Sequence, residues 1–188
     1  MTPDIGQMLL RIAHDTLVAT LRHIPEPSLP SHPLLKEKSG IFCTLNKHGR
    51  LRGCIGFPAP QFVLAKALVD SVRFAALEDP RFPPVDVSEL PAIDIEITVL
   101  TPPMKLVVKD PQEYLSLIEI GRDGLIVSKG RHHRGLLLPQ VPVEHRWSVP
   151  EFLYHTCEKA GLPGDSWRSR DVGVERFQGK VFREKRHN

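Results

Sequence analysis

The sequence has few of the features that mark secreted, membrane or metal-binding proteins. It contains only three cysteines in 188 residues, none in a CxxC arrangement, which argues against a disulfide framework and predicts a reduced, cytoplasmic protein. No apolar run approaches the roughly 20 residues of a membrane span, and the start lacks the charged-then-apolar pattern of a signal peptide. The net charge of +3 is too mild to indicate a nucleic acid as the partner. We therefore expect neither membrane insertion nor specific nucleic-acid binding.

What is present is the composition of an ordinary soluble globular protein, with 41% hydrophobic and 25% charged residues. The length suits one domain, residues 1–188, or two subdomains that share one core. The 18 prolines gather in boundary segments such as 25–27 and 58–60. They predict long connections that are held extended.

Helical and strand-like patterns are mixed along the chain. Apolar positions at helical spacing, together with cap residues, predict helices over about 2–23, 60–78 and 148–161. Alternating or short apolar runs predict strands over 41–45, 51–56, 95–100, 105–108, 125–127, 136–138 and 174–178. Because two hairpins are evident, we predict an α+β fold with a mainly antiparallel sheet and flanking helices.

The hexapeptide Leu51-Arg52-Gly53-Cys54-Ile55-Gly56 is the most informative segment. On a strand, its spacing turns Arg52 and Cys54 toward the same face. The glycines beside them allow a backbone or a ligand to come close. The segment is therefore a candidate site, although its spacing alone does not name a chemistry.

The turn before the hexapeptide, Asn46-Lys47-His48-Gly49, leaves two loop lengths open. We expect a three-residue loop closed by Gly49 in the left-handed conformation. The alternative is a two-residue His48-Gly49 turn, which requires a positive φ at His48.

The loop length decides which residues face the two neighbouring cysteines. The three-residue loop places Phe42 opposite Cys54 and leaves Cys43 on the other face, so the thiols stay unpaired. The two-residue turn would place Cys43 directly opposite Cys54. In the expected register one face is core and comprises Ile41, Cys43, Leu45, Leu51 and Ile55.

The hexapeptide resembles the signature of the AMMECR-type domain family, named for the chromosomal region of an Alport syndrome with midface hypoplasia and elliptocytosis. The resemblance continues, in the family's order, through the segments 79–84, 95–103, 138–141 and 157–163. It thus covers nearly the whole chain. One position departs from the family, which usually has a His where Asp123 stands.

The resemblance implies a larger sheet-and-helix part joined to a smaller subdomain, with a cleft between them. It implies no settled activity. Members in microbes are often encoded beside, or fused to, a Memo-like protein and a radical SAM enzyme, which implies those two proteins as partners in a shared pathway.

Arg52 is the first candidate functional residue, because an inward-facing guanidinium must find a carboxylate or an anionic ligand. We predict Glu96 as its leading partner and Asp79 as the next, with Arg81 completing the cluster. One interpretation is a structural ion-pair network. The other is a pocket that recognises a carboxylate or phosphate on a small molecule.

Cys54 is the second candidate, because Arg52 beside it would favour the thiolate form. The alternative is a small packing residue between glycines. His48 lies more than about 10 Å away along the hairpin, so no general base is evident. The candidate residues are Cys54 and Arg52 as catalytic groups, and Asp79, Arg81 and Glu96 as substrate-binding groups.

The basic run Arg131-His132-His133-Arg134 lacks ligands at metal spacing and is interpreted as a solvated loop. The sequence thus predicts no metal site and identifies no cofactor. Three hypotheses remain. They are a small-ligand enzyme or its substrate-binding subunit, a non-catalytic protein-interaction module, and, less supported, a nucleic-acid-associated protein.

Overall fold

The computed structural model describes residues 4–184 and divides into two compact units. Within that range, unit 1 comprises residues 4–100 and 180–184, and unit 2 comprises residues 101–179. In chain order the helices are α1 (Ile5–Arg22), α2 (Pro33–Lys36), α3 (Leu64–Leu77), α4 (Tyr114–Leu117), α5 (Gln140–Glu144) and α6 (Val149–Lys159), with 3-10 turns η1 (Val87–Ala92), η2 (Pro111–Glu113) and η3 (Gly164–Arg168). The strands are β1 (Ile41–Lys47), β2 (Arg50–Phe57), β3 (Ile93–Leu100), β4 (Met104–Lys105), β5 (Asp123–Lys129), β6 (His133–Leu137) and β7 (Gly173–Arg183).

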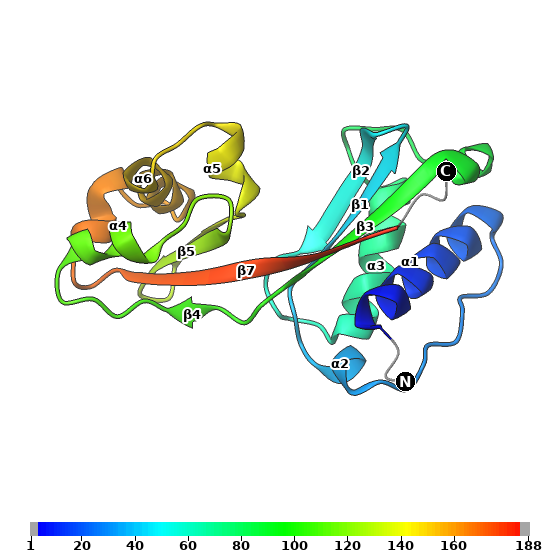
Figure 1. Cartoon of the computed structure of the whole chain (residues 1–188), viewed down its shortest axis with the longest axis horizontal. Coiled ribbons are helices and arrows are strands. Elements are labelled where there is room, and N and C mark those ends of the chain that lie inside the picture. The colour runs from blue at the N-terminus through cyan, green and yellow to red at the C-terminus, as the bar shows by residue number, and fades with distance from the viewer. Residues whose placement is uncertain (1–3, 185–188) are drawn as a thin grey trace. The chain divides into compact units, whose positions relative to one another are not determined.

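Unit 1 is an antiparallel sheet covered on one face by helices. The strand order is β2-β1-β3, and the end of β7 continues the sheet beside β3, where the Glu184 N–H donates to the Ile95 carbonyl at 3.1 Å. Figure 1 shows α1 and α3 against the same face of these strands. The alternating residues Ile41, Cys43 and Leu45 of β1 are fully buried in this core. Their neighbours along the strand remain half-buried on the opposite face.

The residues directly before the two long helices of unit 1 determine where each helix begins. The Asp4 carboxylate accepts from the Gly6 N–H at 2.9 Å and caps α1. Helix α3 begins at Leu64, later than the expected start near residue 60. The reason is that Val63 is extended and pairs with Lys38 in an isolated bridge.

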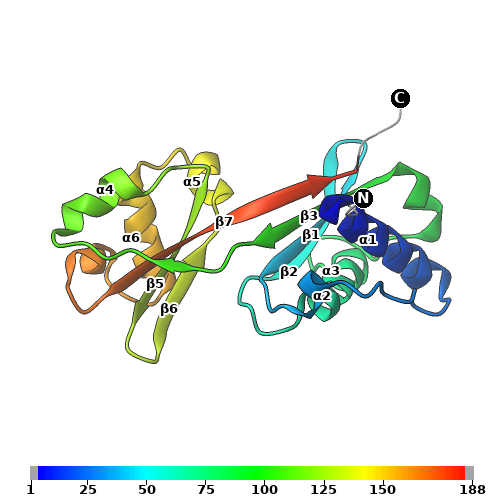
Figure 2. The same ribbon diagram turned by 60° about the horizontal axis from the view of Figure 1, so that its bottom comes forward.

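Unit 2 has its own antiparallel sheet, in the order β6-β5-β7-β4. Helix α6 packs beside β5 and β6 (Figure 2), and it begins at the capping box formed by Ser148 and Glu151, as expected. The unit has a separate apolar cluster around Phe152, Leu153 and Trp167. The strand expected over 105–108 is reduced to β4, because the chain leaves the sheet after Leu106 and Val107 is 83% exposed.

The structure confirms the predicted α+β class with antiparallel strand pairs and flanking helices. None of the helices within residues 4–184 is long and apolar enough to cross a membrane.

Candidate functional site

The hairpin that carries the hexapeptide has a two-residue turn. His48 and Gly49 occupy it with positive φ values of 51° and 75°, the combination required by a type I′ turn. The expected three-residue loop is therefore wrong. Its premise was that His48 would avoid a positive φ, but histidine is among the residues that tolerate the left-handed region best.

A β-bulge in strand β2 then changes the register a second time. Leu45 faces Gly53 and Asn46 faces Leu51, which leaves Arg52 as the extra residue between them. Leu51, expected in the core, is 42% exposed as a result. Such a bulge re-aims the side chains beside it, and here it directs Arg52 away from the helix-covered face.

The bulge separates the two thiols of the hairpin. Cys54 faces Thr44, whose Oγ1 lies 3.2 Å from the Cys54 Sγ, and Cys43 faces Ile55. The prediction that both cysteines stay unpaired on opposite faces is confirmed, although the residue opposite Cys54 is Thr44 and not the expected Phe42. Burial raises the pKa of the Cys43 thiol well above its usual value, so that group stays protonated.

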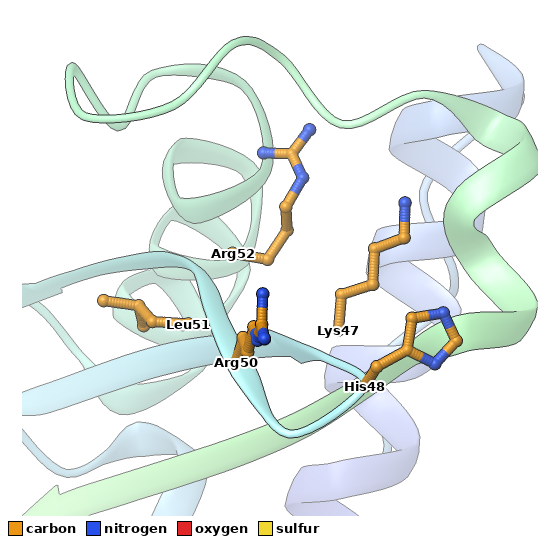
Figure 3. A pocket seen from close by; sticks show the side chains of 5 residues that line it. All are labelled: Lys47, His48, Arg50, Leu51 and Arg52. Carbon is orange, nitrogen blue, oxygen red and sulfur yellow. The ribbon is translucent and has the colours of Figure 1, made fainter.

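The guanidinium of Arg52 is saturated by partners from one loop. Its Nε and Nη2 donate to the two oxygens of Glu89 at 3.1 and 2.9 Å, and Nη1 and Nη2 donate to the carbonyls of Pro83 and Pro84 at 2.9 and 3.2 Å. In Figure 3 the side chains of Arg52 and Lys47 both extend toward this loop, which crosses above the hairpin. Arg52 is 13% exposed, so the prediction of a largely buried, carboxylate-bound arginine is confirmed.

The predicted identity of that carboxylate is wrong. Glu96 lies opposite Thr44 on β3 and pairs with Arg183 of the end of β7. It is not brought to Arg52, because the bulge turns the arginine toward the outer edge of β2 while β3 lies on the other side of β1.

Sequence reasoning missed Glu89, although a local signal was available. Asp86 and Glu89 form a capping box at η1, in which a Glu89 oxygen accepts from the Asp86 N–H at 3.0 Å. This local bond fixes the carboxylate where Arg52 and the Lys47 ammonium both reach it. Hydrogen bonds from Arg52 and then Lys47 lower the pKa of Glu89 to about 2.

Asp79 and Arg81 form a second pair that closes the edge of β2 at Cys54. Asp79 is buried and receives both Nε and Nη2 of Arg81, at 2.9 and 2.7 Å. Asp79 also accepts from the Cys54 N–H at 2.8 Å, and Arg81 donates to the Cys54 carbonyl at 3.1 Å. The bond to Arg81 holds the pKa of Asp79 well below its usual range. The pair thus satisfies the backbone groups that a further strand would otherwise bond.

Cys54 has no catalytic partner of the usual kind. Among residues 4–184, no histidine or carboxylate side chain hydrogen-bonds its sulfur, whose polar neighbours are the Thr44 hydroxyl and the Arg81 guanidinium. Nucleophilic activation of a thiol by a base requires such a contact. The structure therefore brings Arg52, Cys54, Asp79 and Arg81 to one region of unit 1, where Arg52 is paired with Glu89 and Arg81 with Asp79 around a strand edge.

A basic hollow of about 510 Å³ lies at the tip of the same hairpin (Figure 3). Its lining residues are Lys47, His48, Arg50, Leu51 and Arg52. Lys47 and Arg52 share Glu89, whereas the side chains of Arg50 and His48 have no hydrogen-bond or ion-pair partner in the described part of the chain. The tip therefore presents unneutralised positive charge beside the exposed Leu51.

Asp123 stands where the resembled family usually has a His, and it lies in unit 2 with hydrogen-bond partners for its carboxylate. Asp123 is completely buried and accepts from Arg122, from Gln178 and from the Glu119 N–H. In the part of the chain that the structure describes, no three histidine, cysteine or acidic residues are grouped as metal ligands.

Comparison with known proteins identifies the family. The sequence profile described as AMMECR1 matches residues 10–182, nearly the whole chain. The chain belongs to the AMMECR1 family. The resemblance inferred from the hexapeptide and the later segments is thereby confirmed.

Archaeal members of the AMMECR1 family are similar over most of their lengths. A protein of Thermococcus onnurineus is 48% identical over 186 residues, which is 95% of this chain and 90% of that protein. A protein of Methanopyrus kandleri is 49% identical over 190 residues, with 98% and 90% covered. The crystal structure of an uncharacterized protein from Pyrococcus horikoshii matches with a TM-score of 0.77 and 44% identity, and covers 96% of this chain and 91% of its own. Membership in this family therefore establishes the fold of the chain but does not identify a biochemical activity.

Proposed function

We propose that this AMMECR1-family chain is a non-catalytic binding module, in which the hexapeptide is a scaffold for the basic hairpin tip. The observation that carries the proposal is the saturation of Arg52, whose three guanidinium nitrogens all donate within unit 1. An arginine that recognises a substrate needs donors that are free to meet it. Asp79 is committed in the same way, to Arg81 and to the Cys54 N–H. Arg81 is committed only through Nε and Nη2, and its side chain is 54% exposed.

The tip of the hairpin favours an acidic protein segment as the binding partner. Arg50 and His48 are exposed there, and Lys47 and Arg52 add two positive charges against the single negative charge of Glu89. The exposed Leu51 offers apolar contact at the edge of the hollow. Positive charge beside an exposed apolar side chain is typical of a surface that docks a protein.

The partners implied by the family resemblance are the first to test. They are a Memo-like protein and a radical SAM enzyme. In the alternative function, a small-ligand enzyme or its substrate-binding subunit, Cys54 and Arg52 act on the ligand directly. That function requires Arg52 to leave Glu89 and the two proline carbonyls before it can meet a substrate.

A charge reversal at the tip distinguishes the two functions. We expect Arg50→Glu to weaken calorimetric binding of these two purified proteins by about tenfold or more, because it places like charges together. Arg11→Glu is the matched control, since Arg11 is exposed on α1 and has no partner among the described residues. Both variants should melt like the wild type.

The scaffold role is tested separately with Arg52→Gln and Cys54→Ala. Breaking a buried pair typically costs about 3–5 kcal/mol, so Arg52→Gln should lower the melting temperature strongly, and Cys54→Ala should bind the partner normally. The proposal fails if Arg50→Glu binds as tightly as the wild type. The small-ligand function replaces it if Arg52→Gln melts like the wild type and if Arg52→Gln and Cys54→Ala each abolish ligand binding.

A further inference from the structure

A second hollow, of about 480 Å³, lies in unit 2 and takes no part in the proposed function. It is lined by apolar side chains that include Val108, Tyr114, Trp167 and Val172, and by the cations Lys109 and Arg170. Its volume falls within the range typical of small-molecule sites, and polar and apolar atoms share its lining about equally.

Two aromatic residues with hydrogen-bond donors line this hollow, and neither donor has a protein partner in the described part of the chain. Tyr114 is 6% exposed and Trp167 is 2% exposed, and their rings meet edge to face with centroids 6.5 Å apart. Within residues 4–184, neither the Tyr114 hydroxyl nor the indole N–H of Trp167 makes a hydrogen bond. Burial raises the pKa of Tyr114, so its hydroxyl keeps its proton and remains a donor at neutral pH. Neither polar atom is among the fully buried side-chain atoms that lack a partner, so each is accessible to water or to a small ligand.

The cations of the hollow are also uncommitted. Lys109 and Arg170 have no ion pair in the described part of the chain, whereas the nearby Lys129 and Arg168 pair with Asp171 and Asp165 at 2.9 and 3.7 Å. The carboxylate closest in sequence to Lys109 is Asp110, which caps η2 through the Gln112 N–H. The local acids are therefore occupied, and the free charge at the hollow is positive.

We propose that this hollow binds a small organic anion, with an apolar or aromatic body against the Tyr114 and Trp167 floor and a carboxylate or phosphate between Lys109 and Arg170. The polar groups without partners here are all donors: a phenol, an indole N–H, an ammonium and a guanidinium. Such a set selects a ligand rich in acceptors. The apolar floor selects a ligand that also has a ring or chain to bury.

The test uses the indole N–H signals of the full chain in a ¹H–¹⁵N correlation spectrum. The chain has only two tryptophans, and a Trp147→Phe variant assigns the Trp167 signal. We expect phenyl phosphate and benzoate to shift that signal saturably, and each tests one anionic group. Inorganic phosphate lacks the apolar body and benzyl alcohol lacks the charge, so both should bind much more weakly.

Three variants locate the binding. Arg170→Gln should weaken it about tenfold, since it removes a charge-assisted bond. Tyr114→Phe should weaken it roughly three- to tenfold, since it removes only the hydroxyl. Arg131→Gln is the control, because it removes an exposed, unpaired charge of unit 2 that does not line the hollow.

The proposal is overturned if neither aryl anion shifts the Trp167 signal saturably. It is also overturned if benzyl alcohol binds as well as benzoate, or if Arg131→Gln weakens binding as much as Arg170→Gln. The experiment does not involve the hairpin tip of unit 1, so its failure would leave the proposed docking function standing.

Discussion

At the scale of single residues, the candidate site is decided by which carboxylate each arginine meets. The need of Arg52 for a carboxylate followed from the sequence, because a guanidinium cannot lose its charge. The choice of Glu89 over Glu96 did not, because it depends on one bulged residue in β2 and on the capping box at η1. Pairing rules predict that a partner exists, whereas the register and the course of a loop decide which one it is.

The lowered pKa of Glu89 makes a prediction about stability against pH. A carboxyl group whose pKa is lower in the folded chain than in the unfolded chain stabilises the folded chain. This contribution is complete above the ordinary pKa near 4.5, and it is lost as pH falls toward the folded pKa of about 2. Glu89→Gln should therefore be less stable than the wild type at pH 7, and the difference should shrink between about pH 5 and pH 2.

Urea unfolding at a series of pH values measures this difference. Glu37→Gln is the control, because Glu37 is exposed in unit 1 and its side chain has no partner among residues 4–184. A gap between Glu89→Gln and the wild type that stays constant down to pH 2 would contradict the ion-pair account.

At the scale of secondary structure, the elements could be predicted and the hairpin register could not. Period and cap residues located α1, α6 and the two hairpins, because those signals are local. The predicted register is wrong for two reasons. His48 adopts a positive φ at a modest energetic cost, and the bulge in β2 has no sequence signal that we can identify. Because side chains alternate on a strand, one extra residue was enough to change the neighbour of Cys54.

The glycines of the hairpin give a prediction with a built-in comparison. A Cβ on Gly53 would lie 2.1 Å from the Ala75 carbonyl oxygen of α3, so the backbone of the helix would have to move. We expect Gly53→Ala to lower the free energy of unfolding by roughly 1–3 kcal/mol or more. Gly49→Ala meets no atom within 4 Å, but its φ of 75° is unfavourable for alanine, which costs about 1 kcal/mol.

Chemical denaturation measures the free energy of unfolding of both variants. It thus compares the cost of a steric clash at Gly53 with the cost of backbone strain at Gly49. If Gly53→Ala proves as stable as Gly49→Ala, strand β2 does not rest on α3 in the way the structure places it.

At the scale of the whole molecule, composition and family motifs predicted the class of the protein but not where its free charge lies. The net charge of +3 is a sum over paired and unpaired groups. Of the basic loop expected at residues 131–134, Arg134 pairs with Glu175, and His133 contacts the Ala160 carbonyl. In the basic tail, Arg183 pairs with Glu96, and residues 185–186 lie outside the described part of the chain. Cations without partners therefore include those at the hairpin tip and at the rim of the unit 2 hollow, and a count of charges in the sequence does not show which cations are free.

This distribution predicts weak, non-specific binding of nucleic acid. The tip supplies two or three phosphate contacts at most, and the aromatic side chains Tyr114 and Trp167 are buried rather than displayed for base stacking. The logarithm of the binding constant for such a site falls by about 0.9 per phosphate contact for each tenfold rise in salt concentration. Between about 50 and 200 mM salt, the affinity should drop roughly ten- to fortyfold.

Fluorescence anisotropy with RNA and DNA oligonucleotides of several sequences measures this dependence, with Arg50→Glu as the variant and Arg11→Glu as its control. We expect equal, salt-sensitive binding to every oligonucleotide and a further loss in Arg50→Glu alone, since the same cations that would dock an acidic protein segment would contact phosphates. Sequence-selective binding that survives 200 mM salt would instead make nucleic acid the partner of the tip, because phosphate contacts alone can produce neither selectivity nor resistance to salt.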